Sequence, residues 1–121
     1  MAPTLTWGIP TMYKMIFGAK RKPGMSRDDF GTYWTTTHAN LARSVPGIKR
    51  YVINLAPDLS GSGREMAYDG FAEAWFESEA EMKLSNRSPE LKVVLDDEKN
   101  LFDLSTRFSV IVQEHVMIGE S

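Results

Sequence analysis

Strand-like and helical segments alternate along the 121 residues, and their order leaves few folds open. Runs rich in β-branched and aromatic residues, bounded by Pro and Gly, predict four strands. A Ser with acidic residues in the next turn, or with Pro directly after it, predicts the start of each helix. The strands are predicted over 11–20, 48–55, 68–76 and 106–118, and the helices over 26–45, from 78 to about 86, and from 88 onward. This β-α-β-β-α-β order with one extra helix predicts an α+β, ferredoxin-like fold.

A chain of this length has material for one hydrophobic core. Residues 1–10, with two Pro and one Gly, are predicted to be an N-terminal extension, and 11–118 a single domain. The segment 57–65, which contains Ser-Gly-Ser-Gly, is predicted to be a flexible surface loop.

Composition excludes several classes of function. The chain has no Cys, which rules out disulfides, a thiol nucleophile and Cys-ligated metal. Its formal net charge of −2 lacks the basic surplus by which proteins bind nucleic acid. Without a signal-like N-terminus or a run of roughly 20 apolar residues, we expect a cytoplasmic protein with neither a nucleic-acid nor a membrane partner.

The third predicted strand has two unlike faces. Phe71, Glu73 and Trp75 alternate with the small residues Ala72 and Ala74. We expect the small face to lie beneath the helices and the large face to remain uncovered. Because an apolar sheet face is normally buried against a partner, the pattern predicts a homodimer that packs sheet against sheet.

Several motifs together resemble the EthD family of dimeric α+β barrel proteins. The resemblance covers about residues 11–118 and is carried by Phe30, Trp34 and His38 on the first helix, ahead of a Pro-Gly turn and Tyr51. The quoted segments are Lys-Arg-Lys-Pro-Gly-Met-Ser-Arg-Asp-Asp-Phe at 20–30, Val-Pro-Gly-Ile-Lys-Arg-Tyr at 45–51, Tyr-Asp-Gly-Phe-Ala-Glu-Ala-Trp-Phe at 68–76 and Gln-Glu-His-Val at 113–116.

This resemblance implies a function as well as a dimeric α+β barrel. Proteins similar to this one include methylmuconolactone isomerases and fungal enzymes that dehydrate or decarboxylate aromatic polyketides. They share a cofactor-free hydrophobic pocket between helices and sheet, with a helix His as acid or base. The resemblance therefore implies an enzyme, a cofactor-free lyase or isomerase, acting on an apolar oxygenated ring compound such as an aromatic, a lactone or a polyketide-derived intermediate.

Two residues are the candidate catalytic groups. His38 follows Trp34 by four positions, at the edge of the apolar stripe, and an ordinary His titrates near neutral pH. From the residues alone a structural hydrogen bond is the commoner role of such a His, whereas the resemblance makes it the general acid or base that faces the pocket. Tyr51 is expected either to be plain core or to donate a hydrogen bond to a substrate carbonyl or phenol oxygen.

Three further residues are candidates for substrate binding. Phe30 and Trp34 are expected either to be plain core or to form aromatic walls of the pocket. Glu73 lies between two large apolar residues of its strand, where a carboxylate is costly unless paired. It is expected either to face the substrate as an acid or base, or to pair with an Arg such as Arg50 or Arg107 at the dimer interface.

Two other readings of the sequence stay open. One is a protein that binds an apolar metabolite without converting it. The other is an oxygenase, either cofactor-free or with haem bound by His38 or by His115, which is placed on the last strand at the sheet edge or dimer interface. The two His are 77 positions apart and no carboxylates cluster with them, so the sequence predicts no metal site.

Overall fold

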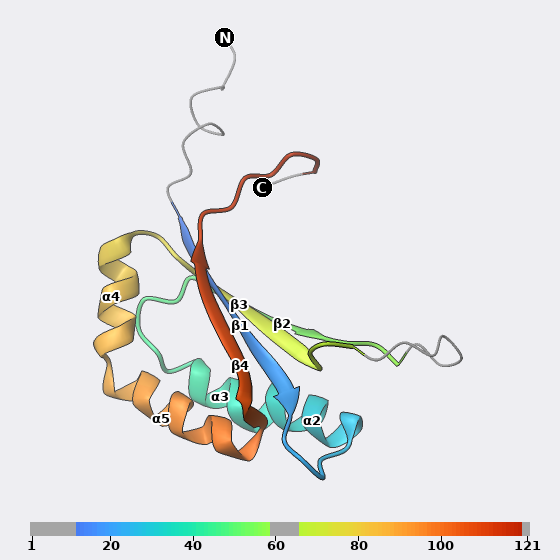
Figure 1. Cartoon of the computed structure of the whole chain (residues 1–121). Helices are drawn as coiled ribbons and strands as arrows, with labels where there is room; N and C mark the ends of the chain where they lie inside the picture. Colours follow the sequence, from blue (N-terminus) through green and yellow to red (C-terminus); the bar gives the residue numbers. More distant parts are fainter. Residues whose placement is uncertain (1–11, 59–65, 120–121) are drawn as a thin grey trace.

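Four antiparallel strands form the sheet of the computed structural model, which describes residues 12–58 and 66–119. The strand order is β2-β3-β1-β4 (Figure 1): the edge strand β2 pairs with β3, which follows it in the chain, whereas the edge strand β4 pairs with the first strand, β1. The strands are β1 (Tyr13–Arg21), β2 (Arg50–Leu55), β3 (Gly70–Phe76) and β4 (Phe102–Val112). The predicted ferredoxin-like plan with an extra helix is confirmed. The predicted N-terminal extension 1–10 and most of the predicted loop 57–65 lie outside the described residues.

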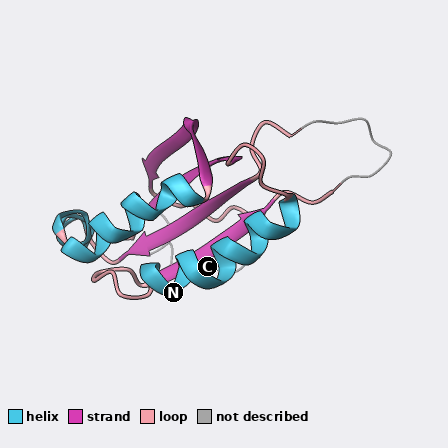
Figure 2. Ribbon diagram, turned by 90° about the horizontal axis from the view of Figure 1, so that it is seen from below, coloured by secondary structure: helices cyan, strands magenta, loops and turns pink. Residues whose placement is uncertain are grey.

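The helices lie against one side of this sheet (Figure 2). They are α2 (Arg27–Tyr33), a π-helical turn (Trp34–His38), α3 (Ala39–Ala42), α4 (Glu79–Arg87), α5 (Pro89–Asp97) and a final 3-10 turn (Glu98–Asn100). All three predicted helix starts are confirmed by their caps. The side chains of Ser26, Ser78 and Ser88 each accept a hydrogen bond at 3.1 Å from the backbone N–H three residues ahead.

The first helix changes its winding at the candidate residues. The backbone N–H of Ala39 reaches the carbonyl of Trp34 five residues back, which is the π-helical spacing. The Thr35 hydroxyl donates to the Gly31 carbonyl and the Thr36 hydroxyl to the Thr32 carbonyl. Because such hydroxyls compete for helix carbonyls, the run of three Thr explains the loosened turn. His38 closes this turn and lies fully inside, rather than at the edge of the apolar stripe.

Small residues on β3 let the first helix lie close to the sheet. Ala72 and Ala74 are buried beneath the helices, as predicted. A Cβ at Gly70 would lie 2.8 Å from the Trp34 ring and 3.2 Å from the Phe30 ring. Only glycine at this position lets both aromatic rings reach the sheet.

The last strand differs from its predicted limits of 106–118. It begins at Phe102, which is buried in the core and pairs with Arg21. Its last described pair joins Val112 to Lys14, near the start of β1. His115 therefore lies exposed in the tail beyond the strand, so its predicted place on the strand is wrong. Strand propensity continued past 112, but the described part of β1 supplies no further partner.

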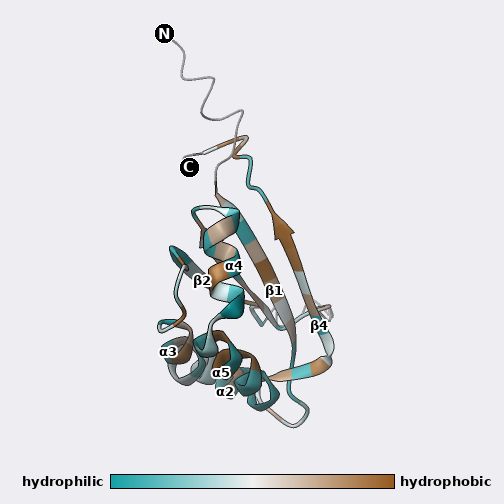
Figure 3. Ribbon diagram, turned by 90° about the vertical axis from the view of Figure 1, so that its left-hand side faces the viewer, coloured by the Kyte–Doolittle hydropathy of each residue, from teal (hydrophilic) through white to brown (hydrophobic). Residues whose placement is uncertain are grey.

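The sheet face opposite the helices, here called the open face, carries a charged cluster among apolar side chains. Lys14 Nζ lies 3.0 Å from Glu73 Oε1 and 3.3 Å from Glu114 Oε2. The ring of Trp75 lies between Lys14 and the guanidinium of Arg50, at 4.9 and 4.8 Å from its centroid. Apolar residues continue along β4, whose end is brown in Figure 3. No helix in the described residues is both long and apolar enough to cross a membrane.

Candidate active site

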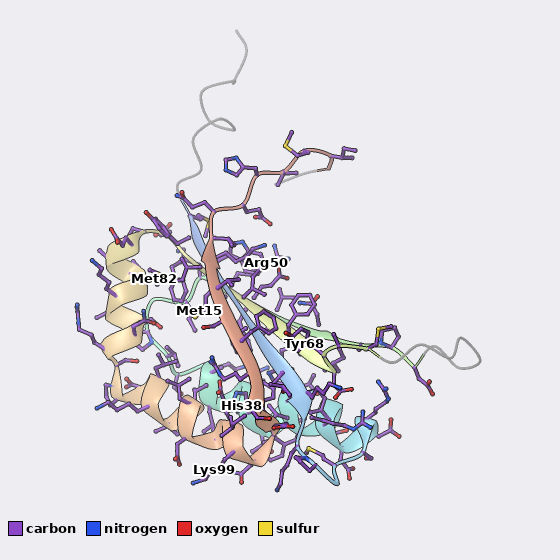
Figure 4. The ribbon with its side chains drawn as sticks, viewed as in Figure 1. Met15, His38, Arg50, Tyr68, Met82 and Lys99 are labelled. Carbon is purple, nitrogen blue, oxygen red and sulfur yellow. The ribbon has the colours of Figure 1, made fainter. Side chains whose placement is uncertain are left out.

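His38 is completely buried between the helices and the sheet, at 0% exposure. Its position is labelled in Figure 4. The His38 ring lies 6.4 Å from that of Phe102, the first residue of β4. One ring nitrogen, Nδ1, is 2.8 Å from Oδ2 of Asp97 on α5. The other, Nε2, is buried and has no hydrogen-bond partner among the described residues. Such a buried polar atom is uncommon in folded proteins and calls for a ligand or a chemical role.

Asp97 decides which nitrogen of His38 carries the proton. Burial acts to raise the pKa of this carboxyl, but hydrogen bonds from Tyr33, Asn100 and His38 outweigh burial and lower the pKa below its ordinary value. The Tyr33 hydroxyl donates to Oδ1 at 2.6 Å and the Asn100 amide at 3.0 Å. At neutral pH Asp97 is thus a carboxylate, which only accepts, so Nδ1–H of His38 must donate. In the neutral form of the imidazole, Nε2 then carries a lone electron pair, as a base requires.

Tyr51 also lies between the helices and the sheet, where its side chain supplies a hydroxyl. The indole N–H of Trp34 donates to the Tyr51 oxygen at 3.0 Å. Burial, the largest cause, and the nearby negative charge of Glu98 raise the pKa of Tyr51 to about 12, although the Trp34 hydrogen bond acts to lower it. Tyr51 therefore keeps its proton at physiological pH. Because its oxygen already accepts from Trp34, its O–H is available to donate.

A buried ion pair lies beside Tyr51. Glu98, only 3% exposed, accepts two hydrogen bonds from Arg107 of β4, at 2.6 Å from Nε and 3.1 Å from the second guanidinium nitrogen. The guanidinium stands 5.7 Å from the ring centroid of Phe17, and Phe17 stacks on Tyr51 at 6.4 Å. The bidentate geometry compensates the buried charge of Glu98.

The structure brings four of the five predicted site residues together. Phe30 and Trp34 are buried and pack edge to face, with ring centroids 5.4 Å apart, so both belong to the core around His38 and Tyr51. Glu73 is not part of this group, because it lies on the open face. Its partners are Lys14, and Asn54 at 3.3 Å, rather than the expected Arg50 or Arg107. Arg107 points to the helix side, where it pairs with Glu98.

Sequence reasoning missed Asp97, Tyr33 and Glu98. Asp97 and Glu98 follow the apolar stripe of the last helix, and two acids at the end of a helix run against the helix dipole. This unfavourable placement was the available signal, but Asp97 contacts His38 and Tyr33 from 59 and 64 positions away, which no local spacing predicts. Among residues 12–58 and 66–119, no three His, Asp or Glu side chains gather as a metal site would require.

Comparisons with solved structures show the same fold in several proteins. An EthD family protein from Bacillus halodurans matches with a TM-score of 0.69 and 19% identity, covering 85% of this chain and 98% of that one. A dimeric ferredoxin-like protein of unknown function from Thermobifida fusca matches with a TM-score of 0.65 and 16% identity, covering 85% and 91%. These likenesses show a fold that occurs in dimeric proteins.

The matching structures include enzymes. Hydroxynitrile lyase from Passiflora edulis has a TM-score of 0.67 and 15% identity, covering 92% of this chain and 100% of that one. A mutant form of SnoaB, a cofactor-independent oxygenase from Streptomyces nogalater, has a TM-score of 0.62 and 14% identity, covering 91% and 99%. At such identities the likeness concerns the fold alone.

No sequence among the curated proteins matches significantly. The model of the EthD domain family matches residues 22–105, more than two thirds of the chain. These residues include the first helix with His38 and the last helix with Asp97, and so both halves of the buried pair. The chain belongs to the EthD family.

Proposed function

We propose that this protein is a cofactor-free lyase or isomerase that moves protons on an apolar, oxygenated ring compound. The observation that carries the proposal is the buried, unpartnered Nε2 of His38, whose opposite nitrogen is held by a carboxylate. A structural His would use both nitrogens. A His with one nitrogen held by a carboxylate and the other unpartnered can accept a proton from a substrate that binds between the helices and the sheet.

In the proposed reaction His38 is the proton acceptor and Tyr51 is the hydrogen-bond donor. Nε2 of His38 takes a proton from the carbon next to a carbonyl group, and the electron pair of the broken C–H bond forms the enolate. Tyr51, still protonated, donates a hydrogen bond to the enolate oxygen. Asp97 remains a carboxylate and stabilises the imidazolium that has formed. His38 then returns the proton to another carbon, which isomerises the substrate, or to a leaving hydroxyl, which dehydrates it.

Aromatic surroundings favour a flat, apolar substrate. The rings of Trp34, Phe102 and Phe17 lie around the two polar groups, with Trp34 and Phe102 at 5.0 Å. Such walls stack on a planar ring and keep water away from the proton transfer. The hydroxynitrile lyase and the cofactor-independent oxygenase are precedents for enzymes with this fold.

Deuterium exchange tests the proposal before the natural substrate is known. Base-catalysed enolisation in D₂O replaces hydrogen next to a carbonyl, which proton NMR detects in 2-tetralone, a ring ketone, and in α-angelica lactone. We expect the protein to accelerate exchange in at least one of them. His38→Ala should lower the accelerated rate at least roughly a hundredfold, the usual size of a general acid–base contribution.

The second histidine provides the matched control. His115→Ala removes an exposed imidazole of the tail and should leave the exchange rate unchanged. Undiminished exchange in His38→Ala, with the fold verified by circular dichroism, would remove the catalytic role. Saturable binding of both compounds without exchange or product would favour the metabolite-binding protein instead. The haem reading stays a prediction, tested by a Soret band that is lost with His38→Ala or His115→Ala.

The open face supports a homodimer as the active form. It carries Phe71 and Val110, 39% and 46% exposed in one chain, beside the internally paired charges of Lys14 and Glu73. A second copy laid on this face would remove the apolar side chains from water. Val110→Glu should yield monomers in light scattering, whereas Leu84→Glu, at a similarly exposed helix position, should not. A dimeric Val110→Glu variant would contradict this interface.

A further inference from the structure

A polar cavity is lined mainly by residues at the turn between β1 and α2, a turn that lies at the bottom of Figure 1, and His38 is not among its lining residues. Its volume is about 390 Å³, within the usual range for small-molecule sites. Its charged lining residues in the described part of the chain are Lys20, Arg21, Lys22, Arg27, Asp69 and Asp103. Among these described residues, four side chains are cationic and two are acidic.

Asp69 forms ion pairs with two of the guanidinium groups. Its Oδ1 lies 2.9 Å from Arg21 and 3.6 Å from Arg27, and its Oδ2 accepts the backbone N–H of Arg21 at 2.8 Å. This carboxylate is only 12% exposed. Each guanidinium has five N–H donors, and these contacts occupy a single nitrogen of each. Asp69 thus orients Arg21 and lies close to Arg27, while most donors of both guanidinium groups stay available.

Other residues that line the cavity contribute a further positive charge and an apolar surface. Lys22 is exposed and has no ion-pair partner among the described residues. Pro23, Met25 and Met66 supply carbon and sulfur surface to the same cavity. An inorganic anion alone would leave much of this volume empty, so the cavity fits an anionic group attached to a larger molecule.

We propose that this cavity binds the phosphate group of a small phosphorylated molecule. A phosphate monoester offers three strongly accepting oxygens to the donors of Arg21, Lys22 and Arg27, whereas a carboxylate offers two. Arginine also binds phosphate through parallel N–H donors, and Arg21, which Asp69 already holds by a hydrogen bond, loses little freedom on binding. The Lys-Arg-Lys-Pro-Gly-Met segment at 20–25 thereby acquires a role that the proton-transfer site does not use.

Titrations followed by ¹H–¹⁵N NMR test the site with defined probes. Phenyl phosphate, benzoate and inorganic phosphate are added to the wild-type protein. We expect phenyl phosphate to shift the amides of 20–27 and Asp69, and to bind at least about tenfold more tightly than benzoate, which carries the same ring and one charge. It should also bind more tightly than inorganic phosphate, because the ring contacts the Met and Pro surface.

Paired variants locate the binding. Arg27→Ala removes a half-exposed side chain whose loss the fold tolerates, and should weaken phenyl phosphate at least about tenfold. Lys22→Ala should weaken it less, and Lys83→Ala, on the distant helix α4, should not change it. Equal binding in Arg27→Ala and Lys83→Ala, or shifts scattered over the surface, would overturn the site. Equal affinities for phenyl phosphate and inorganic phosphate would overturn the organic part of the ligand. None of these readouts depends on His38.

Discussion

The two faces of the sheet differ in how their polar groups are paired. On the open face, Lys14 is paired with Glu73 and Glu114, and Trp75 donates to Glu114 at 3.3 Å. Burial acts to lower the pKa of Lys14, but its two carboxylate partners outweigh burial and raise the pKa. On the helix-covered face, one nitrogen of a completely buried His has no partner among the described residues.

We interpret this difference as a division between one face for dimer assembly and one face for catalysis. Charges that compensate one another within a chain can be covered by a second copy without leaving an unpaired group. An unpartnered buried nitrogen instead costs stability and is retained only where something else uses it. The open face is therefore suited to an interface, and the covered face to a reaction.

Replacing the tryptophan of each face tests the comparison, and here we expect the largest effect on stability. Trp34 is fully buried under the helices, so Trp34→Ala should lower the free energy of unfolding by about 3–5 kcal/mol. Trp75→Ala on the open face should cost less in the monomer, and its cost should grow with protein concentration because the dimer needs that face. Urea unfolding at two concentrations measures both. Equal, concentration-independent losses would contradict the distinction.

The two acids test which face carries the reaction. Asp97→Asn should lower the deuterium exchange rate roughly ten- to a hundredfold, because an amide no longer holds Nδ1–H and favours the wrong tautomer. The ¹⁵N shifts of His38 should report a proton moved to Nε2, and the loss of exchange activity should accompany this change of tautomer. Glu73→Gln should leave the exchange rate within about twofold. A tenfold loss there would return Glu73 to the substrate site.

Tyr51 tests how much the covered face depends on its hydroxyl. Tyr51→Phe leaves the buried indole N–H of Trp34 without an acceptor and should cost about 1–3 kcal/mol in urea unfolding. The pH dependence gives a second readout. Since the folded pKa of about 12 exceeds the ordinary 10.0, the neutral phenol stabilises the fold fully below pH 10.0, and this contribution is lost as pH rises through 12. Tyr51→Phe should flatten the stability curve between those values.

Acid unfolding compares a carboxyl of each face and has the smallest expected effect. The folded pKa of Asp97 lies below its ordinary 3.8, so its contribution is present above that value and is lost as pH falls through the folded pKa. Asp97→Asn should therefore show a shallower loss of stability in acid than the wild type. Glu114→Gln should change the slope less, because Glu114 is 43% exposed and its interactions are screened. A larger effect for Glu114 would reverse the comparison.

Local patterns in the sequence determined the order of elements, the three Ser caps and the small face of β3. These features depend on residues two to four positions apart, and such spacings can be read directly from the chain. The family motifs also singled out His38, Tyr51, Phe30 and Trp34, which the structure brings together. The sequence could not show which role His38 has, because that depends on the partner of each ring nitrogen.

Only the tertiary structure decided those partners. Asp97 is 59 positions from His38 and 64 from Tyr33, and no local spacing predicts that they meet. Packing also decided that β4 ends where its described partner ends, and that Glu73 pairs with Lys14 across the strands. Secondary structure follows from short-range sterics and hydrogen bonds, whereas a buried polar pair exists only once two elements close over it. The sequence therefore determined the frame of this protein, and long-range packing determined its candidate chemistry.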